Sequence, residues 1–135
     1  MSPEPQLAQQ LRAMVDKAER ALKAAQRHLD TGDQDFASSS AYYAVFHMMQ
    51  AALLTKELTF SKHAGVISGF SQHFIKTGLF PEEFGQQIQR LRRDREVGDY
   101  GYSLTVDPDD AHEDVAVAGQ IVSAIKAFVI PLAGP

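Results

Sequence analysis

Apolar residues recur at intervals of three and four positions along most of the chain, and long stretches contain no proline. This spacing is typical of α-helices that bury one face. The first such stretch covers residues 6–29 and ends at Thr31-Gly32, because glycine readily adopts the left-handed conformation that closes a helix. Its apolar stripe consists of Leu7, Leu11, Met14 or Val15, Ala18, Leu22, Ala25 and Leu29.

The second stretch, residues 36–56, is apolar on almost every side rather than along one stripe. A helix of this kind has to be covered on several sides. It is therefore either the centre of a helical bundle or part of an oligomer interface. Asp33 or Asp35 can cap its first turn, because a short carboxylate side chain accepts hydrogen bonds from the free backbone N–H groups there.

Start and stop signals predict two further helices. Ser61 is placed to cap a third helix, which runs to Lys76 and closes at the glycine turn of residues 77–78. Pro81 and the two glutamates after it open a fourth helix, residues 81–97. Proline and acidic side chains both suit the first turn of a helix.

A loop rich in glycine and tyrosine, residues 98–107, leads to a fifth helix over residues 107–129, which Pro131 stops. No alternation of apolar and polar residues demands a strand. The pattern predicts an all-α fold, an antiparallel up-down helical bundle of about five helices with short connections. A chain of 135 residues is one domain's worth. We therefore expect a single domain over residues 1–135.

Composition narrows the chemistry that the chain can support. The formal net charge of −4 does not favour nucleic acid as a whole, so any polyanion site must be local. Cysteine is absent, which excludes disulfides, thiolate metal sites and a cysteine nucleophile. Histidine pairs of the H-E-x-x-H type are also absent, so we expect no structural zinc and no cofactor.

Targeting signals are not visible in the sequence. The first five residues are polar and are not followed by the apolar core of a signal peptide. We see no apolar run that approaches the roughly 20 residues needed to span a bilayer. These patterns, together with the lack of cysteine, predict a soluble cytoplasmic protein that does not contact a membrane.

Four arginines crowd the end of the predicted fourth helix, at positions 90, 92, 93 and 95. The apolar stripe of this helix, Phe84, Ile88 and Leu91, continues to Arg95, since the steps are four, three and four residues. A buried guanidinium must find an acceptor or a cleft. Either Arg95 pairs with Asp99 while the other arginines form a solvated basic face, or the cluster binds phosphate, whose oxygens match the planar fork of arginine.

The segment from Arg95 to Tyr102, REVGDYGY, resembles the signature of the HEPN domains, small helical proteins that are widespread in prokaryotes. Many members carry R-x4–6-H, and the present chain is most similar to a subgroup with R-x3-D-Y in place of the histidine form. Residues 38–54, 62–78 and 107–129 resemble the central helix, the helix that follows it and the last helix of these domains. The resemblance covers about residues 5–130.

The resemblance implies a protein that binds RNA or nucleotide phosphate. In the histidine form of the family it implies a metal-independent endoribonuclease toxin, in which the RNA 2′-hydroxyl attacks the neighbouring phosphate. It places Arg95 as the phosphate clamp, Tyr100 in the proton-transfer or hydrogen-bonding position, and Asp99 as the group that orients Arg95. Tyr100 stands where the family histidine would be, and the tyrosine pKa of about 10 handicaps it as a base. Arg92 and Arg93 are further candidates for binding.

The resemblance also implies partners. The toxin would pair with a small nucleotidyltransferase antitoxin, and Tyr102 matches the tyrosine that receives AMP from such a partner in some members. We expect a two-fold homodimer that brings two arginine clusters to one basic cleft, which would bind RNA or a nucleotide. The alternatives are a non-catalytic nucleotide-binding or adaptor module and a purely structural helical interaction domain.

The remaining aromatic and histidine residues have both structural and functional interpretations. His47 is either a core histidine satisfied by a hydrogen bond or a cleft residue near Arg95. His63, at the start of the third helix, is expected to be structural or solvent-facing. Tyr42 and Tyr43 are expected to be core or interface aromatics.

Overall fold

The computed structural model describes residues 5–102 and 104–134. Residues 1–4, on which part of the signal-peptide prediction rests, and residues 103 and 135 lie outside the described part. The described residues form five α-helices and one short π-helix and contain no strand, so the predicted all-α bundle is confirmed. The elements are α1 (Pro5–Asp30), α2 (Gln34–Leu54), α3 (His63–Phe70), η1 (Ser71–Ile75), α4 (Glu83–Tyr100) and α5 (Pro108–Leu132).

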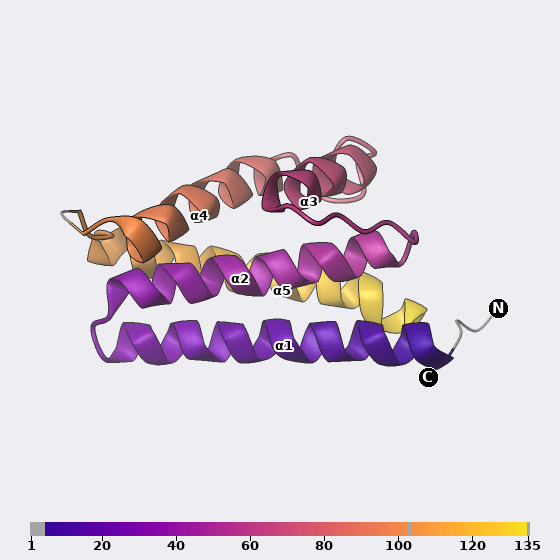
Figure 1. Ribbon diagram of the computed structural model, residues 1–135, viewed down its shortest axis with the longest axis horizontal. Coiled ribbons are helices and arrows are strands. Elements are labelled where there is room, and N and C mark those ends of the chain that lie inside the picture. The colour runs from indigo at the N-terminus through magenta and orange to yellow at the C-terminus, as the bar shows by residue number, and fades with distance from the viewer. Residues whose placement is uncertain (1–4, 103, 135) are drawn as a thin grey trace.

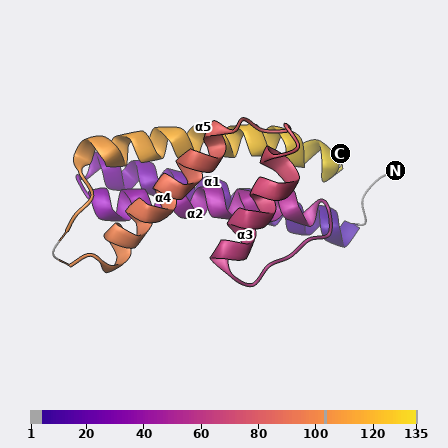
Figure 2. The same ribbon diagram turned by 90° about the horizontal axis from the view of Figure 1, so that it is seen from above.

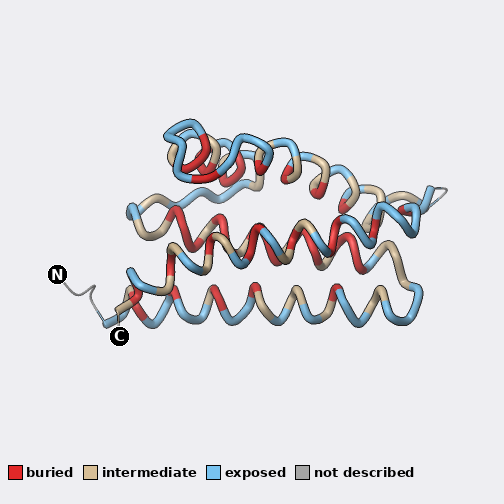
Figure 3. Tube along the Cα trace, turned by 180° about the vertical axis from the view of Figure 1, so that it is seen from behind, coloured by how far each residue is buried: buried red, intermediate tan, exposed pale blue. Residues whose placement is uncertain are grey.

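Helix α2 is the centre of the bundle. It packs against α1, α3, α4 and α5, and Figure 1 shows α1 on one side of it, α5 behind it, and α3 and α4 on the side away from α1. Figure 2 shows α3 and α4 crossing the long axis of the bundle obliquely. Buried positions therefore follow α2 along its whole length (Figure 3). The first of the two interpretations of this helix is correct, and its apolar surface is used within one chain.

The ends of several helices differ from the sequence prediction. Asp33 occupies the position before α2 but makes no side-chain cap, and Asp35 instead accepts a hydrogen bond of 2.9 Å from the backbone N–H of Val106. The residue before α3 is Lys62, not Ser61, and it makes no side-chain cap either. Pro131 lies inside α5, which ends at Leu132. Capping signals in the sequence compete with tertiary partners that only the fold supplies.

Helix α4 extends into the predicted loop of residues 98–107 and ends at Tyr100. The reason lies at Gly98, where α4 passes very close to the start of α2. A Cβ atom at this position would lie 2.5 Å from the backbone oxygen of Asp35. Glycine is therefore needed here for close approach rather than to end the helix.

Helix α5 corrects a second expectation. Its 25 residues include an 18-residue window with a mean hydropathy of 1.9, so by length and composition it could cross a membrane. Lys126 and several small residues interrupt the apolar run in this helix, so the sequence pattern did not reveal the window. In the bundle, one face of α5 packs on α1 and α2, and Lys126 pairs with Glu19 of α1 at 3.1 Å. A core helix of a bundle can be as long and as apolar as a membrane-spanning helix. The contacts of α5 are those of a core helix.

Candidate functional site

Arg95 lies on the buried face of α4, four residues after Leu91, as its position in the apolar stripe predicted. The residue is only 8% exposed. The central carbon of its guanidinium group lies 5.0 Å from the ring centre of Tyr42 and 5.8 Å from that of Tyr43, both on α2. These distances are those of cation–π contacts. The paired tyrosines of α2 thus form one wall of an arginine site.

The charge of Arg95 is only loosely compensated. Its nearest carboxylate is that of Asp99, with 3.7 Å between Arg95 Nη1 and Asp99 Oδ2, which is too long for a hydrogen bond. Asp99 Oδ1 accepts a shorter hydrogen bond of 2.6 Å from the hydroxyl group of Ser39. Among the described residues, the buried Nε of Arg95 has no hydrogen-bond partner. A buried arginine with unused donors is costly unless a ligand supplies the acceptors.

Arg92, nearly one turn before Arg95 on α4, shows the same pattern. Its Nε is buried without a hydrogen-bond partner in the described part of the chain, and the nearest Glu96 oxygen is 3.9 Å away. Arg93 points to another side of α4 and is exposed. Arg92 and Arg95 therefore form the site with unused donors, and Arg93 adds positive charge near it.

His63, the first residue of α3, completes this site. Its ring stacks on Phe46 with 4.1 Å between the ring centres and 12° between the planes. Its Nδ1 lies 2.8 Å from the hydroxyl oxygen of Tyr42. Partial burial lowers the pKa of His63 below its usual 6.5, and the positive charges of Arg95 and then Arg92 lower the pKa further. Burial raises the pKa of Tyr42, an effect that Arg95 opposes.

The sequence pattern does not assign His63 to the site. Residue 63 is far from residue 95 along the chain, and only the packing of α3 and α4 around α2 brings the two together. The one available signal was the position of His63 at the opening of a helix that follows two paired tyrosines. From spacing alone, that position gave no reason to prefer a functional role.

The remaining candidates, Tyr100, Tyr102 and His47, have surroundings that differ from those of Arg95. Tyr100 is 68% exposed and Tyr102 is 99% exposed. On a helix, a residue five positions after Arg95 lies about 140° further round the axis, so Tyr100 faces away from the Tyr42 wall. His47 interacts with Gln50 and Lys17; partial burial lowers its pKa, and the charge of Lys17 lowers it further.

Arg90 belongs to a separate ionic cluster that joins α4 to α5. It lies 2.6 Å from Glu113, 3.4 Å from Asp110, 3.5 Å from Asp114 and 3.8 Å from Asp94. Asp114 is buried and accepts a hydrogen bond of 2.9 Å from Ser38. Burial first, and the neighbouring Asp94 second, raise the pKa of Asp114 to about 8. Arg90 is therefore neutralised by structural partners.

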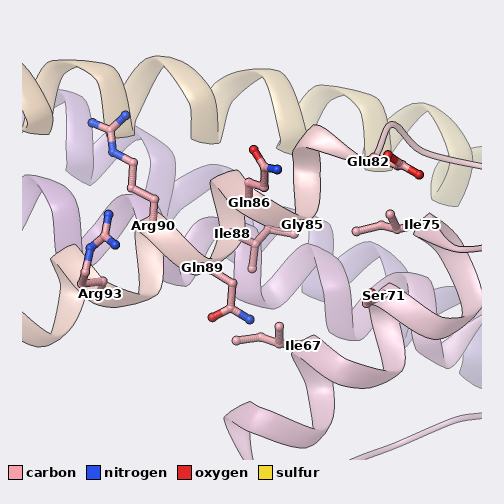
Figure 4. A pocket seen from close by; sticks show the side chains of 10 residues that line it. All are labelled: Ile67, Ser71, Ile75, Glu82, Gly85, Gln86, Ile88, Gln89, Arg90 and Arg93. Carbon is pink, nitrogen blue, oxygen red and sulfur yellow. The ribbon is translucent and has the colours of Figure 1, made fainter.

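A surface pocket of about 560 Å³ lies between α4 and the segment formed by α3 and η1. Figure 4 shows Arg90 and Arg93 at one end of it, and Ile67, Ile75 and Ile88 along its apolar part. Neither Arg95 nor His63 lines this pocket. Within residues 5–102 and 104–134, no group of three or more His, Asp or Glu side chains is placed to hold a metal ion.

The fold and the site define a class of protein: a small antiparallel helical bundle with a buried arginine near the end of its fourth helix, facing two tyrosines of the central helix. The sequence pattern of the HEPN domain family matches residues 11–128 of this chain. The chain belongs to the HEPN domain family, as the sequence resemblance predicted.

Relatives and a solved structure agree with this assignment. The chain is 32% identical over 120 residues to "Putative toxin MJ0605" of Methanocaldococcus jannaschii, an alignment that covers 89% of each protein. It is 38% identical over 101 residues to a UPF0332 protein of Gloeobacter violaceus, which covers 75% of each. The crystal structure of TT1696 from Thermus thermophilus has the same fold, with a TM-score of 0.73 and 17% identity over 87% of this chain and 96% of that one.

Proposed function

We propose that this protein is an endoribonuclease toxin that binds an RNA phosphate at Arg95 and Arg92. The observation that carries the proposal is the state of Arg95, which is buried. Among the described residues, its ion pair with Asp99 spans 3.7 Å and its Nε has no hydrogen-bond partner. A phosphate group would supply the missing acceptors, because its oxygens match the guanidinium fork. The relative named "Putative toxin MJ0605" supports the biological role.

The chemistry of the proposal is attack of an RNA 2′-hydroxyl on the adjacent phosphate. Negative charge grows on the phosphate oxygens as the new bond forms. Arg95 is held in place by the rings of Tyr42 and Tyr43 and by Asp99, which Ser39 anchors in turn. A donor that is already positioned in a partly buried site stabilises such developing charge without having to reorganise.

The proposal includes two kinds of partner. A two-fold homodimer would place two arginine clusters at one cleft, and a solution mass near twice 14.9 kDa is the expected result of light scattering.

A nucleotidyltransferase antitoxin would transfer AMP to Tyr102, whose side chain is almost fully exposed. An added phosphate near Arg95 would compete with RNA for the same charge. A chain mass that a cognate nucleotidyltransferase leaves unchanged would contradict this part.

A second candidate function is nucleotide or RNA binding without cleavage. One observation favours it: Tyr100, which stands at the position of the motif histidine, is exposed and on a different side of α4 from the Tyr42 wall. If Tyr100 is the only proton-transfer group, the site binds phosphate but has no efficient base. Cleavage separates the two functions.

The test is cleavage of total cellular RNA by the purified protein in EDTA. We expect the wild type to cleave and Arg95→Ala to lose at least about a hundredfold in rate, as is typical when one donor to a developing charge is removed. Arg20→Ala is the matched control, because Arg20 is an exposed arginine of α1 paired with Asp16. Folded wild-type protein that binds RNA without cleaving it would support the second candidate. Equal rates for Arg95→Ala and Arg20→Ala would remove Arg95 from the site.

A further inference from the structure

Cleavage by the 2′-hydroxyl needs a group that accepts a proton near neutral pH, and neither the arginines nor the tyrosines of the site provide one. Arginine remains protonated in proteins. Burial raises the pKa of Tyr42, which makes it a poorer base than an ordinary tyrosine. Tyr100 faces away from the Tyr42 wall. Asp99 lies beside Arg95, but it accepts a hydrogen bond from Ser39. The imidazole that the structure brings to Arg95 is that of His63.

Side chains of α2 fix the position of this imidazole, which the first residue of α3 carries. The fully buried Tyr42 of α2 joins the two functional groups, since its ring lies under the guanidinium of Arg95 and its hydroxyl group meets His63 Nδ1 at 2.8 Å. Phe46 stacks on one face of the histidine ring, and the Tyr43 ring meets it edge-on with 6.1 Å between ring centres. The ring orientation is therefore determined by packing and by a hydrogen bond, as a proton-transfer group requires.

The hydrogen bond to Tyr42 also leaves one nitrogen of the ring for a ligand. When Nδ1–H donates to the Tyr42 oxygen, Nε2 carries the free lone pair. Within the described residues, Nε2 makes no hydrogen bond, and the His63 side chain is only partly buried. Nε2 is therefore the ring nitrogen that remains available to a ligand.

We propose that His63 is the general base of the ribonuclease reaction and that Tyr42 is its positioning residue. This inference rests on the proposed function. His63 Nε2 takes the proton of the 2′-hydroxyl while the 2′-oxygen forms a bond to phosphorus and the bond from phosphorus to the 5′-oxygen breaks. The products are a 2′,3′-cyclic phosphate and a 5′-hydroxyl end. The 5′-oxygen receives a proton from water, and His63 later returns its own proton to solvent.

The surroundings of His63 suit this role. Arg92 and Arg95 face it from α4, and Tyr42 and Tyr43 face it from α2. Partial burial and the two arginines lower its pKa below 6.5, so the neutral form that can act as a base predominates at pH 7. The rate should therefore fall as the pH decreases through this lowered pKa, because protonated imidazole cannot accept a proton.

The experiment compares the kinetics of His63→Gln with those of wild type, using a short RNA oligonucleotide in EDTA. We expect kcat to fall at least about a hundredfold, as for loss of a general base, with KM changed by no more than about twofold. The loss of rate at low pH that wild type shows should disappear. His73→Gln is the matched control, because His73 lies in η1 outside the site. Circular dichroism checks that each variant is folded.

A second measurement tests contact independently of cleavage. The imidazole signals of His63 are followed by NMR during titration with RNA that carries 2′-O-methyl groups and cannot be cleaved. We expect the His63 signals to shift and its pKa to rise, because a bound phosphate favours the protonated ring. The signals of His73 should not move.

The outcomes separate the inference from the proposed function. If wild type cleaves and His63→Gln cleaves equally well, the inference is wrong while the ribonuclease proposal stands. If wild type binds RNA through Arg95 but does not cleave it, the ribonuclease proposal is wrong and the inference falls with it. Cleavage that His63→Gln removes, together with unmoved His63 signals, would assign the residue a structural role and would also overturn the inference.

Discussion

Arg90 and Arg95 lie on the same helix, but their charges are compensated in very different ways. Arg90 is surrounded by carboxylates from α4 and α5, and its contact with Glu113 is 2.6 Å long. Arg95 has one carboxylate at 3.7 Å and at least one buried donor without a partner among the described residues. The first arrangement stabilises the fold, whereas the second is what a binding site requires.

The acidic side of the Arg90 cluster predicts how stability depends on pH. Burial and Asp94 raise the pKa of Asp114 to about 8, far above its value in an unfolded chain. The folded protein therefore holds a proton on this site that the unfolded chain releases above about pH 4. The free energy that the bound proton contributes to stability is fully present below about pH 4. It is lost as the pH rises through about 8.

We expect Asp114→Asn to remove this pH dependence, since the amide keeps the shape of the protonated acid and does not titrate. Between pH 5 and pH 8, the unfolding free energy of wild type should fall relative to that of the variant by roughly 3–4 kcal/mol. Urea denaturation at both pH values measures the difference. Parallel curves for the two proteins would show that Asp114 is ionised in the folded state.

The predictability of the site from the sequence differs from residue to residue. The place of Arg95 on the buried face of α4 could be predicted because one helix period carries the information, and its burial confirms that placement. The contacts of His63 and Tyr42 could not be predicted, because they depend on how α3 and α4 cross α2. Tyr100 and Tyr102 were chosen because they match positions of the family motif, and the structure leaves both exposed.

At the scale of the element, the end of α4 holds the site together. Gly98 allows this end to touch the start of α2, so that the next residue, Asp99, reaches Ser39 at 2.6 Å and lies beside Arg95. The sequence predicted a loop here, because glycine usually marks the end of a helix. Close packing between two helices uses the same residue for a different reason, and spacing along one helix does not reveal which reason applies.

We expect Gly98→Ala to lower the free energy of unfolding by about 1–3 kcal/mol, because the added methyl group would overlap the backbone of Asp35. Gly119→Ala is the matched control. A Cβ atom at Gly119, inside α5, would meet nothing within 4 Å. This substitution should raise the unfolding free energy by about 0.5–1 kcal/mol, as alanine favours helices. Urea denaturation measures both, and equal effects would contradict the close approach of α4 to α2.

At the scale of the whole molecule, an acidic chain carries a local basic site. The net charge is −4, yet Arg92, Arg93 and Arg95 lie within about one turn of one helix. Acidic residues neutralise Arg90 on the side facing α5 and leave the side facing α2 and α3 positive. RNA binding should therefore depend on a few ionic contacts rather than on the overall charge, and it should weaken as salt is added.

The most direct test of the central claim is the binding of uncleavable RNA to wild type, Arg95→Ala and Arg20→Ala as a function of salt concentration. For three phosphate contacts on a single strand, the logarithm of the wild-type binding constant should fall with the logarithm of salt concentration with a slope of about −2. Arg95→Ala should bind at least about tenfold more weakly, with a slope smaller in magnitude by about 0.7. Arg20→Ala should match wild type. Equal affinities and slopes for all three proteins would show that the Arg95 site does not bind RNA.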